Sequence, residues 1–138
     1  MRILSAFLLL LPLAAAAQDF PSRPVKIIVP YAAGGGTDAV ARLVAARMTT
    51  TMGQPVVVEN RPGAAANIGA EAVAKSPADG YTVLVTAPNF SSSEALFEKL
   101  GWKFEDFVPV AHLARYANVL VASNSSQLTS DRKSPRLN

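Results

Sequence analysis

Apolar residues along this chain form short β-type runs that alternate with stretches of helical spacing. The run at 25–29 (VKIIV) is rich in β-branched residues and nearly continuous in its apolar character, which is typical of a buried strand in a parallel sheet. From 38 to about 52, apolar residues recur at three- and four-residue intervals, which predicts an amphipathic helix. We expect Thr37 to cap this helix and Gly53 to end it.

The same alternation continues toward the C-terminus. Further strands are predicted at 55–58 (ending at 59–60), 81–85 and 119–122, and further helices at about 67–75 and 91–100. Strands that alternate with helices imply βαβ units, right-handed crossovers and a parallel sheet. We therefore predict an α/β fold over residues 18–123.

Three loops leave the carboxyl ends of predicted strands, at 30–37, 59–67 and 86–93. In parallel sheets, ligands bind beyond these ends. The first two loops are rich in glycine and alanine and the third in serine. Consecutive glycines let backbone N–H groups converge, and the following helix adds the positive end of its dipole. We expect an anion-binding corner where the loops meet.

The first seventeen residues have the three parts of a secretory signal peptide. Arg2 supplies a positive charge, 3–13 is an apolar run, and 14–17 are alanines suited to cleavage. The run is too short for a membrane span, and the alternative is a buried N-terminal helix. We expect cleavage after Ala17 and export to the periplasm. With no cysteine, neither a disulfide nor a lipid-modified cysteine is expected.

Composition excludes several classes of function. The formal charge of +3 comes from Arg2 and a basic tail, so residues 18–123 carry nine basic and nine acidic residues, unlike a nucleic-acid binder. A single histidine, His112, and no cysteine provide no adequate zinc ligand set. No serine lies in a Gly-x-Ser-x-Gly setting. We expect no cofactor, no metal and no catalytic residues.

One alternative from another class is an NAD(P)-binding, Rossmann-type enzyme. Gly34, Gly36 and Ala39 satisfy the dinucleotide fingerprint, and Glu59 ends the next predicted strand. Against this, residues 30–33 separate the strand from the glycines, whereas the fingerprint turns tightly off the strand. Export would also take the chain away from free NAD.

Four motifs occur in order at 30–38 (PYAAGGGTD), 59–69 (ENRPG with NIG), 78–81 (ADGY) and 106–110 (DFVPV). In this order and spacing, the chain resembles the periplasmic substrate-binding receptors of tripartite tricarboxylate transporters, the Bug or TctC-like family, over roughly residues 18–123. The resemblance implies a two-domain, Venus-flytrap receptor of the type II-like periplasmic binding proteins, with residues 18–123 as the N-terminal α/β part of its solute-binding domain. Such a receptor is not an enzyme. It captures a small carboxylate as a monomer and delivers it to membrane permease subunits.

The resemblance also implies ligand-binding residues. By position these are Tyr31, Ala33, Gly34, Gly35 and Thr37 in the first loop and Ala64, Ala65, Ala66 and Asn67 in the second. Ser91 is a further candidate because its loop leaves a strand carboxyl end. Asp38 would repel a carboxylate, so we expect it to hold the glycine loop instead. The family often has glycine at positions 65 and 66. Because alanine disfavours positive φ, we expect this loop to differ in shape from that of family members with glycine here, or to bind another ligand.

The last fifteen residues depart from the family's pattern. Residues 124–138 are polar, rich in serine and arginine, and without apolar periodicity, so we expect a disordered tail. The resemblance implies a second domain that does not follow residue 123. We therefore expect a product truncated to its first domain, with impaired ligand capture.

Overall fold

The computed structural model describes residues 20–117, 119, 121, 123 and 125. The predicted signal peptide and its cleavage point lie outside these residues. So does the predicted tail, apart from Ser125.

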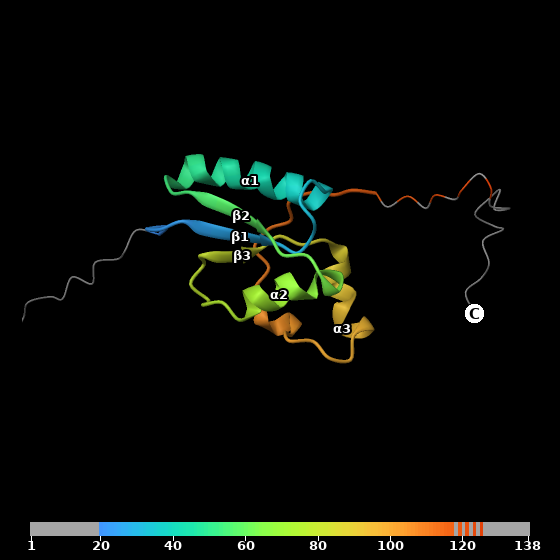
Figure 1. The fold of residues 1–138 in the computed structure, drawn as a ribbon. Coiled ribbons are helices and arrows are strands. Elements are labelled where there is room, and N and C mark those ends of the chain that lie inside the picture. The colour runs from blue at the N-terminus through green and yellow to red at the C-terminus, as the bar shows by residue number, and fades with distance from the viewer. Residues whose placement is uncertain (1–19, 118, 120, 122, 124, 126–138) are drawn as a thin grey trace, which may run out of the picture.

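A parallel sheet forms the centre of the described part (Figure 1). Its three strands are β1 (Val25–Val29), β2 (Val56–Asn60) and β3 (Thr82–Leu84), in the order β2-β1-β3. Along β1, Val25 pairs with Val56 and Val29 with Asn60, while Lys26 to Ile28 pair with β3. The predicted parallel α/β fold and its first three strands are confirmed, with bounds that differ by one residue at some strand ends.

Helices cover both faces of this sheet (Figure 1). The helix α1 (Gly36–Met52) lies over one face, and α2 (Asn67–Ala74) lies over the other, preceded by the 3₁₀ turn η1 (Ala64–Ala66). As predicted, α1 ends at Gly53, which has a left-handed φ of 66° and donates its N–H to the Thr49 carbonyl.

The prediction that Thr37 caps α1 is wrong, because Gly35 is the N-cap. The carboxylate of Asp38 accepts the N–H of Gly34 at 2.8 Å. This bond folds the residues before Thr37 into the first turn, so the helix begins at Gly36, two residues earlier than predicted.

The predicted helix at 91–100 is also wrong in its bounds. The structure has a 3₁₀ helix η2 (Pro88–Ser92), one turn of α-helix α3 (Ser93–Leu96), and an extended Phe97. Serine hydroxyls explain the shortness. Ser91 Oγ donates to the Pro88 carbonyl (2.7 Å) and Ser92 Oγ to the Asn89 carbonyl (3.0 Å), and such bonds compete with the helical backbone.

After α3 the chain forms one more short element, the 3₁₀ helix η3 (Phe104–Asp106). Its aromatic neighbours join it to η2, since the Phe90 ring stacks on Trp102 with centroids 4.6 Å apart. The predicted strand at 119–122 lies partly outside the described residues. Val119 and Val121 are described, and neither is in a strand.

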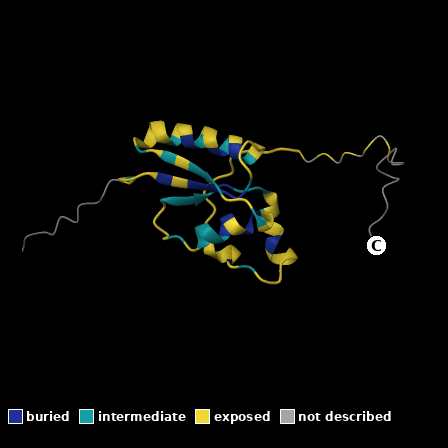
Figure 2. Ribbon diagram, viewed as in Figure 1, coloured by how far each residue is buried: buried dark blue, intermediate teal, exposed yellow. Residues whose placement is uncertain are grey.

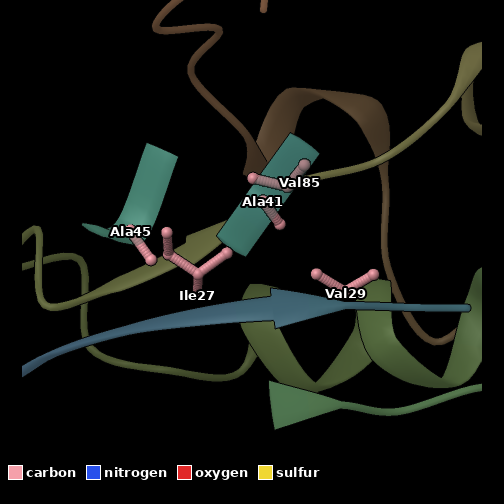
Figure 3. Close-up of a cluster of buried hydrophobic side chains, with 5 residues drawn as sticks. All are labelled: Ile27, Val29, Ala41, Ala45 and Val85. Atoms are coloured by element: carbon pink, nitrogen blue, oxygen red, sulfur yellow. The ribbon is translucent and has the colours of Figure 1, made fainter. Parts of the chain in front are cut away.

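The apolar core lies between β1 and α1, where Ile27 and Val29 face Ala41, Ala45 and Val85 (Figure 3). Burial of an isoleucine or valine side chain stabilises the fold by about 1.5–3 kcal/mol. The two alanines let α1 approach the sheet closely. Its outer face is exposed, whereas β1 is buried apart from Lys26 (Figure 2). Within the residues that the structure describes, no helix combines the length and apolar character needed to cross a membrane.

Candidate functional site

The candidate site lies at the carboxyl edge of the sheet. Because all three strands are parallel, the loops at 30–37, 59–67 and 86–93 leave the sheet on the same side. We call them the first, second and third loop. Hydrogen bonds between side chains and backbone connect each of them to the others.

Asp38 connects the first loop to the end of β2. The residue is 3% exposed. Its side chain accepts three hydrogen bonds, from Gly34 N–H (2.8 Å), Asn60 Nδ2 (2.9 Å) and Arg42 Nε (2.9 Å). Asn60 Nδ2 also lies 3.1 Å from the Tyr31 carbonyl, which it donates to. The Arg42 guanidinium, the Gly34 N–H and the Asn60 amide hold the pKa of Asp38 well below its usual range. The carboxylate therefore stays ionised, and its negative charge is paired with the Arg42 guanidinium.

The first turn of α1 supplies backbone donors at this edge. The N–H groups of Gly36, Thr37 and Asp38 have no carbonyl four residues earlier within the helix. The amide of Gly35 has no acceptor among the described residues. These donors point from the positive end of a 17-residue helix. An anion at the first loop would meet several N–H groups at once.

The second loop has a left-handed backbone. Ala64, Ala65 and Ala66 have φ of 46°, 53° and 82°, and Gly63 precedes them with φ 129°. Left-handed φ costs a non-glycine residue roughly 1–2 kcal/mol. The three alanines nevertheless adopt positive φ, although the alanine side chain disfavours this conformation. The loop is closed by bonds from Ala66 N–H to the Gly63 carbonyl (3.0 Å) and from Asn67 N–H to the Ala64 carbonyl.

Asn67, the first residue of α2, is buried directly after this loop. It is 8% exposed, and neither its amide nitrogen nor its amide oxygen has a partner among the described residues. Buried polar groups are nearly always hydrogen-bonded. Asn67 thus carries unused donor and acceptor capacity next to the left-handed alanines.

The third loop contacts both others. The Tyr31 hydroxyl donates to Asn89 Oδ1 (2.5 Å), accepts the Ala87 N–H (3.2 Å) and lies 3.3 Å from Thr86 Oγ1. Asn89 Nδ2 in turn donates to the Ala65 carbonyl (3.4 Å). All three loops are therefore held in one cluster, as the predicted parallel sheet required.

The predicted site residues differ in exposure within this cluster. Ala33, Gly34, Gly35, Ala64, Ala65 and Ser91 are exposed, Tyr31 and Thr37 are half-buried, and Ala66 and Asn67 are buried. Sequence reasoning missed Asn60, Arg42 and Asn89, which connect the loops. Asparagine is common in turns, so its presence in a loop does not by itself indicate a binding site. Only the position of Asn60 at the end of a predicted strand pointed to the site.

The features that suggested a dinucleotide site have other roles. Six residues separate the end of β1 from the start of α1, whereas the fingerprint turns directly off the strand. The Glu59 carboxylate, proposed as the ribose ligand in that hypothesis, lies 2.5 Å from Arg61 Nε and 3.1 Å from Lys26 Nζ. In the described part of the chain, no group of three or more His, Cys, Asp or Glu side chains could hold a metal ion.

Comparison with known sequences identifies a family. The family model described as "Tripartite tricarboxylate transporter family receptor" (TctC) matches residues 40–130. Protein BugT of Bordetella pertussis is 41% identical over 117 residues, which are 83% of this chain and 36% of BugT. A UPF0065 protein from the TAR-I ttuE-ttuC' intergenic region of Agrobacterium vitis is 46% identical over 114 residues, 81% of this chain and 33% of that protein.

Solved structures agree with this result. R. palustris Rpa4515 with adipate is 43% identical, with a TM-score of 0.59 over 62% of this chain and 29% of that one. A TctC solute binding protein from Polaromonas, without ligand, is 36% identical, with a TM-score of 0.53 over 59% of this chain and 29% of that one. The chain spans about a third of the length of the curated relatives that it matches. It belongs to the receptor family of the tripartite tricarboxylate transporters, whose members are periplasmic receptors.

Proposed function

We propose that this chain forms the N-terminal, ligand-capturing part of a receptor that binds a small organic carboxylate for a tripartite tricarboxylate-type transporter. The observation that carries the proposal is the meeting, at the N-termini of α1 and α2, of the unused backbone donors of the first loop and the Asn67 side chain that follows the second, which is unpartnered within the described part of the chain. A relative that is 43% identical was solved with adipate, a dicarboxylate, which supports this ligand class.

Backbone amides are the principal donors in this proposal, because the nearby cations are already paired. Arg42 binds Asp38, and Arg61 binds Glu59. A carboxylate is well served by several converging N–H groups without a counter-charge. The proposed ligand contacts are Tyr31, Ala33, Gly34, Gly35, Thr37, Ala64, Ala65, Ala66, Asn67 and Ser91, with Asp38 holding the first loop.

Gly34 and Gly35 have different roles in the first loop. Gly34 has φ 85° and gives its N–H to Asp38, so it shapes the turn. Gly35 has φ −77° and keeps its N–H available to a ligand. Asn67 supplies side-chain capacity from the second loop, and its amide matches either a carboxylate oxygen or a ligand hydroxyl.

The cellular setting is also part of the proposal. We propose that a signal peptide cleaved after Ala17 directs the chain to the periplasm, where the receptor acts as a monomer. Permease subunits of the transporter would be transient partners. A second domain would close over the ligand, because enclosure from two sides is what small-molecule sites require.

The test is calorimetric titration of residues 18–138 with succinate, malate, adipate and citrate, with 1,6-hexanediol as the uncharged counterpart of adipate. We expect saturable binding of one or more carboxylates and none of the diol. Gly35→Pro removes the N–H at a φ that proline accepts, and it should weaken binding about tenfold, as loss of one charge-assisted hydrogen bond does. Gly35→Ala keeps the N–H, and its Cβ would lie 3.6 Å from the Ala32 carbonyl oxygen, so it should bind like the unchanged chain. Failure of every carboxylate to bind would contradict the proposal.

A further inference from the structure

The Tyr31 hydroxyl spans from the first loop to the third. It donates to Asn89 Oδ1 at 2.5 Å and accepts the Ala87 N–H at 3.2 Å. Thr86 Oγ1 lies 3.3 Å away. With its donor and an acceptor position used inside the protein, this hydroxyl is committed to the third loop, so the ligand contact proposed for Tyr31 falls to its other atoms. The aromatic ring packs against the apolar core below it.

Asn89 extends the connection to the second loop. Its Nδ2 donates to the Ala65 carbonyl at 3.4 Å, while its Oδ1 receives the Tyr31 hydroxyl. The middle alanine of the left-handed run is thereby tied to a residue 24 positions later in the chain. One pair of side chains thus joins all three loops.

The second loop needs such support. Three consecutive non-glycine residues at positive φ store strain that persists only where surrounding contacts hold it. Within the loop, two backbone bonds restrain the turn, from Ala66 N–H to the Gly63 carbonyl and from Asn67 N–H to the Ala64 carbonyl. The bond from Asn89 to the Ala65 carbonyl restrains the same turn from outside.

We infer that Tyr31 and Asn89 form a polar strut that sets the spacing of the three loops and holds the left-handed alanines in place. Both are then positioning residues for carboxylate capture, and Asn89 acts without touching the ligand. This inference rests on the proposed function for its effect on binding, but its effect on the loops stands without a ligand.

The first measurement is amide hydrogen exchange by NMR on ligand-free residues 18–138. We expect Tyr31→Phe and Asn89→Ala to speed exchange of the Ala66 and Asn67 amides by about tenfold, with β1 amides unchanged. Tyr81→Phe is the matched control. It removes the same atom from a hydroxyl bound to Ser22, at the opposite end of β3 from the third loop. It should leave both amides unaffected.

The second measurement is adipate titration of the same variants. We expect Tyr31→Phe and Asn89→Ala each to weaken adipate binding severalfold. Because the two residues act as a unit, the double variant should bind adipate no more weakly than the single variant with the lower affinity. Unchanged exchange at Ala66 and Asn67, or fully additive losses of affinity, would overturn the strut. If the unchanged chain binds no carboxylate, the proposed function fails, while the exchange result still decides the strut.

Discussion

The first and second loops lie at the ends of neighbouring strands and each leads into a helix, yet they are built differently. The first contains three glycines, of which only Gly34 has positive φ. The second reaches the left-handed region with three alanines at 64–66. Glycine adopts such conformations at little steric cost, whereas alanine is strained there. Glycine content therefore does not show where the left-handed backbone lies.

The two loops also differ in how their buried polar groups are satisfied. In the first, Asp38 is ionised and has three donors. In the second, Asn67 is neutral and has no partner among the described residues. The first loop is thus an internally completed structure that presents backbone donors. The second keeps a buried amide side chain without a partner among the described residues, and neighbouring contacts maintain its strained backbone.

Gly69→Ala should have the largest effect, because it separates the two loops. A Cβ at Gly69 would lie 2.7 Å from Pro30 Cβ in the first loop and 3.0 Å from the Arg61 carbonyl oxygen in the second. We expect a loss of about 1–3 kcal/mol in the free energy of unfolding, as for other overpacked sites, measured by urea denaturation.

The control for that variant is Gly36→Ala, where a Cβ would meet no atom within 4 Å. This change at the start of α1 should be neutral or slightly stabilising. Equal losses for the two variants would show that the close contact at Gly69 does not hold the loops together.

Asp38→Asn should disable the first loop while leaving the second intact. An amide loses the charge that pairs with Arg42 and places an NH₂ group where the carboxylate accepts bonds. We expect affinity for a dicarboxylate to fall about tenfold, measured by calorimetry. Asp79→Asn, in the exposed pair with Arg23, should leave affinity unchanged. A similar loss in both variants would point to a general charge effect.

Acid should weaken the fold through the carboxylates of Asp38 and Glu59. The folded pKa of Asp38 is depressed, chiefly by its bond with Arg42, and that of Glu59 is lowered by Arg61 and Lys26. Groups with depressed pKa values stabilise the fold above their unfolded pKa of about 4 and lose that contribution as pH falls through the folded pKa. We expect the free energy of unfolding to be flat from pH 7 to 5 and to decline below about pH 4.

Asp38→Asn should make that decline shallower, because the titrating group is gone. Urea denaturation at several pH values between 7 and 2 checks this. If the free energy of unfolding falls with pH equally steeply in the variant, titration of Asp38 does not contribute to the pH dependence of stability.

Ala65→Gly should have the smallest effect and the opposite sign. Glycine relieves strain at φ 53°, but it adds freedom to the unfolded chain. We expect a net gain of about 0.5 kcal/mol in the free energy of unfolding. The same substitution at Ala46, exposed in the middle of α1, should cost about 1 kcal/mol. A loss at both positions would mean that the alanine turn is not strained.

Much of the fold was predictable because it depends on local patterns. The β-branched run at 25–29 and the helical spacing after residue 38 report which face of each segment is buried, and burial is encoded over a few residues. The same reasoning failed at 91–100. There, serine hydroxyls compete for carbonyls at short range, and apolar spacing does not register that competition.

The order of apolar and polar residues is enough to predict a parallel α/β domain with glycine- and alanine-rich loops at one edge, and four motifs in order point to the receptor family that the comparisons confirm. The side chains that join the loops can be identified only from the folded arrangement. Asp38 meets Asn60 across 22 positions, and Tyr31 meets Asn89 across 58. Such contacts depend on strand register and on the approach of helices to the sheet. The left-handed alanines were decided the same way, because the chain's preference opposes a conformation that surrounding contacts maintain.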